Sequence, residues 1–230
     1  MVVVTGDTHG NFQRLYSRKY KSLNNGDYVL ICGDFGGVWH DCERQDAVLD
    51  SLDNLPFTVL FADGNHENYD LLNQFPVQQW NGGQVHVIRP NVLHLMRGNV
   101  FEIEQKSFFV MGGAASHDLW NGVYDPEHPD HEKYDALYRD GEFFRIKGLS
   151  WWEQELPTDE EINQAWDALC AHEKKIDYRG RERHKLRIVR GRRIERACGG
   201  EGRACRPFFV WRGHFRASHT LSCRGDGAAG

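Results

Sequence analysis

The chain has 230 residues, 40% of them hydrophobic and 27% charged, which suffices for one domain with a sizeable core, or one domain with an appendage. No apolar run approaches the roughly 20 residues of a membrane span, and the N-terminus shows no signal-peptide pattern, so we expect a cytoplasmic protein that has no membrane partner. The six cysteines lack the close paired spacing of a disulfide framework or a zinc site.

The formal net charge of -5 conceals two different halves. Residues 179–230 contain 14 basic and 4 acidic residues, a balance of +10, whereas residues 1–178 contain 14 basic and 29 acidic residues, a balance of -15. A basic tail can bind nucleic acid. The tail has aromatic residues but no recognisable binding module, so nucleic acid is not the expected partner.

Three apolar runs share one design, in which each run leads into a glycine and into polar side chains that can bind metal. They are Val2–Thr5 before Gly6, Asp7, Thr8 and His9; Tyr28–Cys32 before Gly33 and Asp34; and Val59–Ala62 before Asp63, Gly64, Asn65 and His66. Such runs are typical of buried strands. The 27 residues from Asp7 to Asp34 and the 31 from Asp34 to Asn65 each fit one crossover helix of a parallel sheet. We therefore expect these polar residues at the carboxyl edge of an α/β sheet, where ligands bind.

Further elements follow from periodicity and turn residues. We expect helices over residues 11–22, 45–52 and 68–75, the second burying Ala47, Val48, Leu49 and Leu52. Short strands over residues 85–88, 92–96, 100–103 and 107–110 predict an antiparallel meander that forms a second sheet. Residues 116–150 are irregular and either line the substrate pocket or form a surface excursion.

A capping box predicts where the last helix begins. Thr158 and Glu161 have the required spacing, and the helix is expected to run to about Glu173. A strand starts at Ile176 but is expected to stop at Tyr178, where the composition changes to Arg and Gly.

The metal-type loops carry a resemblance to a known family. Asp7-Thr8-His9, Gly33-Asp34 and Gly64-Asn65-His66-Glu67, each after a strand, resemble the motifs of the calcineurin-like metallophosphoesterase superfamily. Residues 112–116 and 148–153 resemble its bacterial branch. The resemblance covers residues 1–178 and implies an α/β fold, a two-sheet sandwich flanked by helices. Residues 1–178 would be the metallophosphoesterase domain, incomplete at its C-terminal end, and residues 179–230 a poorly ordered or out-of-frame tail.

The resemblance also implies a site and an activity. Asp7 and His9 would bind a first metal ion, Asp34 would bridge two, and Asn65 would bind the second. His66 would act as general acid or phosphate contact, with Asn65 and His66 touching the substrate. The cofactors would be two divalent transition metal ions, Mn, Fe, Zn or Co. The implied reaction is hydrolysis of phosphate mono- or diesters by a metal-bridging hydroxide.

Each residue has another interpretation when taken alone. Asp7 could cap a helix, His9 could be a surface residue, and Asn65 could hold a left-handed turn. His117 is a weaker candidate for the site, and His40, His86 and His94 are expected to be structural or surface residues.

Two departures from the family pattern suggest an alternative function. Gly37 stands where many members have an aspartate that supports the catalytic histidine, and the later metal-binding histidines are missing unless His184, His214 or His219 replaces them. Arg216 stands where the family's last histidine is expected. The alternative is an impaired or inactive member that binds metal weakly.

Overall fold

The computed structural model describes residues 1–172, 176–181 and 189–190. The poorly ordered tail expected over residues 179–230 lies mostly outside this part of the chain, and so do His184, His214 and His219.

The main sheet of the molecule has six strands in the order β1-β2-β3-β6-β5-β4. The strands are β1 (Val2–Gly6), β2 (Tyr28–Cys32), β3 (Thr58–Ala62), β4 (Val77–Trp80), β5 (Gly83–Arg89) and β6 (Val92–Leu95).

The predicted strands at the start of the chain are confirmed, and they are parallel. β1 pairs with β2, β2 with β3, and β3 with β6, all in parallel, whereas β4 and β5 are antiparallel to their neighbours. The four parallel strands therefore end at the same edge of the sheet.

A second sheet has the order β12-β11-β8-β7. Its strands are β7 (Asn99–Ile103), β8 (Lys106–Met111), β11 (Tyr178–Arg181) and β12 (Val189–Arg190). The predicted four-strand meander is therefore wrong in part, because β5 and β6 belong to the first sheet. All four residues of β6 are buried, as expected of a strand covered on both faces in the middle of a sheet. The expectation that the strand stops at Tyr178 is also wrong, because β11 continues to Arg181 in parallel with β8.

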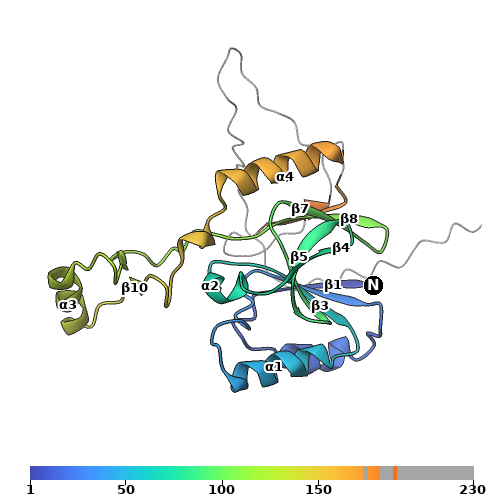
Figure 1. The fold of residues 1–230 in the computed structure, drawn as a ribbon. Helices are drawn as coiled ribbons and strands as arrows, with labels where there is room; N and C mark the ends of the chain where they lie inside the picture. Colours follow the sequence, from blue (N-terminus) through green and yellow to red (C-terminus); the bar gives the residue numbers. More distant parts are fainter. Residues whose placement is uncertain (173–175, 182–188, 191–230) are drawn as a thin grey trace, which may run out of the picture.

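Three apolar clusters show how the layers pack (Figure 1). One cluster joins the main sheet to α1 (Glu43–Asp53) and to the 3-10 turns η1 (Gln13–Tyr16) and η2 (Arg18–Tyr20). A second fills the space between the two sheets, and a third lies between the second sheet and α4 (Asp159–Ala171). The molecule is thus a two-sheet sandwich flanked by helices, as the sequence predicts.

The helices agree with the prediction in part. α1 and α4 are confirmed, and α2 (Tyr69–Leu72) is shorter than expected. The predicted helix over residues 11–22 is two 3-10 turns, and Ala47 and Val48 of α1 are exposed. In the part of the chain that the structure describes, no helix has the length and apolar character that a membrane crossing needs.

Residues 117–150 form an arm that projects away from the two sheets (Figure 1). The arm contains β9 (Val123–Tyr124) paired with β10 (Arg145–Ile146), and α3 (His131–Arg139), which the sequence did not predict. The rings of Tyr124, Tyr134 and Phe144 pack together inside it. The sequence could not show this small core, because its residues lie in three separate segments.

Candidate functional site

The ends of three parallel strands place the candidate residues side by side. Gly6 of β1 is in register with Cys32 of β2, which in turn is in register with Ala62 of β3. The loops that carry Asp7, Asp34 and Asn65 therefore leave the sheet at one level.

Asp7, His9 and Asp34 form a cluster of possible metal ligands. One ligand atom from each lies within 4.8 Å of the others. His9 Nε2 lies 3.5 Å from Asp34 Oδ2, with the His9 side chain half exposed and Asp34 buried. The interpretation of Asp7 as a helix cap is wrong, because η1 begins after Phe12 and has no side-chain cap.

The backbone holds this cluster in an unusual conformation. His9 and Asp34 both have a positive φ, at 45° and 42°. The N–H groups of Thr8 and His9 donate to the carbonyl of Asp34, at 3.0 and 2.8 Å. Strained backbone of this kind persists only where its surroundings enforce it, and it is often found at functional sites.

Two glycines allow the β1 and β2 loops to approach each other. A Cβ on Gly10 would lie 2.9 Å from the carbonyl oxygen of Gly36, and one on Gly36 would lie 2.8 Å from the amide nitrogen of Gly10. Any other residue at either position would push the loops apart. The spacing between Asp7 and Asp34 therefore depends on both glycines.

His66 approaches the cluster from the β3 loop. Its backbone N–H donates to Asp34 Oδ1 at 2.9 Å, and its ring centroid lies 5.4 Å from that of His9. Burial is the main cause that lowers the pKa of His66, and the cation of Arg145 lowers it further. The carboxylate of Asp34 raises it, but the pKa of His66 stays below its ordinary value.

Gly37 has no room for a carboxylate. A Cβ there would meet the ring of Phe35 and lie 2.9 Å from Cζ of Phe12. A side chain at this position would therefore collide with the two aromatic rings packed against it.

Asn65 is buried and oriented by a neighbouring loop. Its Nδ2 donates to Ser116 Oγ at 3.0 Å, which leaves Oδ1 as the amide atom able to bind a cation. Ser116 in turn donates from N and Oγ to the buried carboxylate of Glu155, at 2.8 and 2.6 Å. The interpretation of Asn65 as a left-handed turn is wrong, because its φ is not positive.

His117 follows Ser116, is exposed, and is not a member of the ligand cluster.

Glu67 fastens the β3 loop to the β2 loop. Its buried carboxyl accepts from the N–H groups of Phe35 and Gly36, at 2.6 and 3.2 Å. Burial raises the pKa of Glu67 to about 8, although these two hydrogen bonds lower it. Sequence reasoning placed Glu67 in the motif without a role, and the structure gives it this one.

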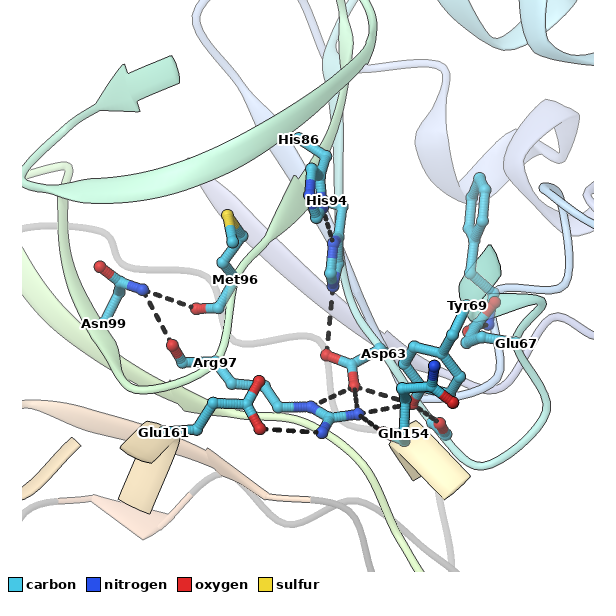
Figure 2. A network of polar contacts seen from close by, with 12 residues as sticks. Asp63, Glu67, Tyr69, His86, His94, Met96, Arg97, Asn99, Gln154 and Glu161 are labelled. Carbon is cyan, nitrogen blue, oxygen red and sulfur yellow. Dashed lines mark hydrogen bonds and ion pairs between the residues drawn. The ribbon is translucent and has the colours of Figure 1, made fainter. Parts of the chain in front are cut away.

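A buried polar network surrounds Asp63, two residues before Asn65 in the chain (Figure 2). Asp63 Oδ2 accepts from Arg97 Nε at 2.6 Å and from the Tyr69 hydroxyl at 3.0 Å, while Asp63 Oδ1 meets His94 Nε2 at 3.1 Å. His94 Nδ1 lies 2.9 Å from His86 Nδ1. The Tyr69 hydroxyl also lies 2.6 Å from the carbonyl of Gly64, the residue before Asn65. His86 and His94 are therefore structural, as expected, and the network positions the Asn65 loop.

The donor set fits a metal ion. Two carboxylates and an imidazole are ligand types that suit Mn, Fe, Zn and Co, and the three ligand atoms are close enough to meet one cation. The backbone contacts of Thr8, His9 and Asp34 tie the two loops that carry them together.

A sandwich fold with this cluster at its strand ends is that of an α/β protein suited to metal binding. Comparison with protein families is more specific: the calcineurin-like phosphoesterase family matches residues 1–196, and the chain belongs to it. The family in general consists of metal-dependent hydrolases of phosphate esters. Comparisons with curated proteins and with solved structures found no match.

Proposed function

We propose that this chain hydrolyses phosphate mono- or diesters at a two-metal site. The observation that carries the proposal is the Asp7, His9 and Asp34 cluster, with its ligand atoms within 4.8 Å of one another at the carboxyl edge of the parallel strands. Divalent cations, when bound, would supply Lewis acidity that activates water and neutralises phosphoryl charge.

Each residue has a role in this proposal. Asp7 and His9 hold one cation, Asn65 the other, and Asp34 bridges them. Asn65 and His66 also face the substrate. His66 acts as general acid or contacts a phosphoryl oxygen.

A second candidate is an impaired member that binds metal weakly. β11 lies parallel to β8 with Arg181 beside Met111, so its carboxyl end approaches the site edge, yet Tyr178–Arg181 contains no histidine or carboxylate. With Asp34 counted for both, the described residues supply three ligands to one cation and two to the other, whereas catalytic metals are usually held by three or more.

Metal content and turnover of the full chain separate the two candidates. The purified chain is stripped of metal, reloaded with Mn²⁺, Fe²⁺, Zn²⁺ or Co²⁺, and assayed on p-nitrophenyl phosphate. The first candidate predicts two equivalents of metal and metal-dependent turnover. It also predicts that Asp34→Asn removes most of the bound metal while the fold survives, because a bridging carboxylate touches both ions.

The matched control is Asp41→Asn, an exposed aspartate seven residues further along the chain. It should leave metal content and turnover unchanged. Full occupancy in Asp34→Asn would contradict the bridging role. A wild-type chain without turnover on any of the four metals would favour the impaired member.

A further inference from the structure

The root of the arm carries a partly buried ion pair that neither the sequence motifs nor the proposed metal site explains. Asp118, on the outgoing segment, accepts from Arg145 at both carboxylate oxygens, through Nε at 3.3 Å and through NH2. Arg145 NH1 also donates to the carbonyl of Ser150, at 3.2 Å, where the chain returns to the body. The guanidinium thus ties the two ends of the arm together.

This pair lies at the end of the arm next to Ser116, a residue bonded to the candidate site. Ser116, two residues before Asp118, receives the hydrogen bond from Asn65 Nδ2. The charges of Arg145 and Asp118 both act on the imidazole of His66, and His66 acts in turn on Asp118. Asp118, which holds the guanidinium, is therefore only two residues along the chain from a side chain bonded to Asn65, the neighbour of His66.

Arg145 keeps hydrogen-bond donors that the ion pair does not use. A guanidinium has five N–H groups in a planar fork. Among the described residues, the contacts of Arg145 to Asp118 and Ser150 engage one each on Nε, NH1 and NH2, which leaves one N–H on NH1 and one on NH2. The side chain is only 11% exposed, so its orientation is fixed before any ligand binds.

We propose that Arg145 is a substrate-binding residue that contacts a phosphoryl oxygen beside His66 and favours phosphomonoesters over diesters. Guanidinium forks match phosphate oxygens in geometry and charge. A monoester dianion carries one more charge than a diester monoanion, and the second ester group of a diester takes the place of an oxygen that the fork could bind. Asp118 is the positioning residue that holds the fork. This inference specifies the substrate class of the proposed function and rests on it.

The test compares the two ester classes in one set of variants. Wild-type, Arg145→Gln and Arg145→Lys chains, each loaded with Mn²⁺, are assayed on p-nitrophenyl phosphate and bis(p-nitrophenyl) phosphate. Because Arg145→Gln removes a charge-assisted hydrogen bond, kcat/KM on the monoester should fall by about 10- to 100-fold. The loss in kcat/KM of Arg145→Gln on the diester should be less than about threefold, because the diester offers the fork one oxygen fewer. Arg145→Lys should recover part of the monoester rate. Equal losses on both esters would overturn the proposal.

Two further variants exclude a purely structural role. Arg139→Gln removes the same charge from exposed α3 of the same arm and should change neither substrate. Asp118→Asn breaks the ion pair but keeps the cation, so it should cost less than Arg145→Gln on the monoester. If Asp118→Asn reproduces the full loss of Arg145→Gln, Arg145 only holds the arm and the proposal fails.

Binding of inorganic phosphate tests Arg145 without turnover. Titration calorimetry on the metal-free chain should show a dissociation constant about tenfold higher for Arg145→Gln than for wild type. Equal constants, or no phosphate binding by wild type, would overturn the inference. A chain that binds phosphate through Arg145 but hydrolyses neither ester would refute the proposed function alone.

Discussion

At the scale of single residues, the hydrogen bond between Asp63 and His94 can have only one direction. Burial raises the pKa of Asp63, but the Arg97 cation and the His94 hydrogen bond outweigh burial and hold the pKa below its ordinary value. Asp63 is therefore ionised and accepts, so His94 donates from Nε2. Nδ1 of His94 lies 2.9 Å from Nδ1 of His86, so one of the two rings donates to the other there.

This arrangement makes the fold sensitive to acid. Burial and the neighbouring His94 lower the pKa of His86 to about 4 from 6.5. Because the unfolded chain binds the proton more tightly, the stability from this group is complete above pH 6.5 and is lost as the pH falls toward 4. The loss between pH 6.5 and 4.5 is about 2 kcal/mol.

We expect His86→Asn to reduce the acid sensitivity of stability. Asparagine keeps an N–H donor for His94 and does not titrate. Urea unfolding at pH 6.5 and 4.5 should show a smaller drop in the variant than in wild type, by about 2 kcal/mol. His40→Asn, at an exposed histidine, is the control and should keep the wild-type drop. A drop in His86→Asn equal to that of wild type would show that His86 does not titrate in this way.

The sequence predicted individual residues well where they share a motif. Asp7, His9 and Asp34 converge as expected, because parallel strands end at one edge. Arg145 and Asp118 were not predicted, because 27 residues separate them and no local pattern marks either one. Asp63 and Arg97 were missed for the same reason.

At the scale of elements, α4 shows how a local signal sets a boundary. Thr158 Oγ1 accepts from the N–H of Glu161 at 3.1 Å, and Glu161 Oε2 accepts from the N–H of Thr158 at 2.8 Å. The predicted capping box is confirmed, because every atom it needs lies within four residues. The meander was predicted wrongly in part, because the division of its strands between two sheets depends on long-range contacts that a short apolar run does not encode.

We expect Thr158→Ala to destabilise the protein by about 1 kcal/mol, since it removes the acceptor for one otherwise unpaired N–H at the start of α4. α4 packs on the second sheet through Ala165 and Leu169, so the loss should appear in global unfolding. Thr158→Ser keeps the acceptor and should stay close to wild type. The check is the urea midpoint of each variant, and equal midpoints for the alanine and serine variants would refute the cap's contribution.

At the scale of the whole molecule, Arg97 links the first sheet, the second sheet and α4, which otherwise pack through separate apolar clusters. It lies in the turn from β6 of the first sheet to β7 of the second. Its guanidinium reaches Asp63 after β3, the carbonyl of Gln154 at 2.7 Å, and Glu161 of α4 at 3.4 Å (Figure 2). One buried side chain thus fastens both sheets and α4 to the residue that precedes the Gly64–Asn65 loop.

We expect Arg97→Met to cost about 3 to 5 kcal/mol, because it leaves the buried carboxylate of Asp63 without its cation. Adding Asp63→Asn should recover much of this loss, since the double variant no longer buries an unpaired charge. Arg89→Met is the control: Arg89 also pairs with two carboxylates, Asp46 and Asp50, but both are exposed, so its loss should be about 1 kcal/mol or less. Urea unfolding of the single and double variants measures the coupling between Arg97 and Asp63. Strictly additive losses would show that the two charges do not depend on each other, and that the layers are held together by apolar packing alone.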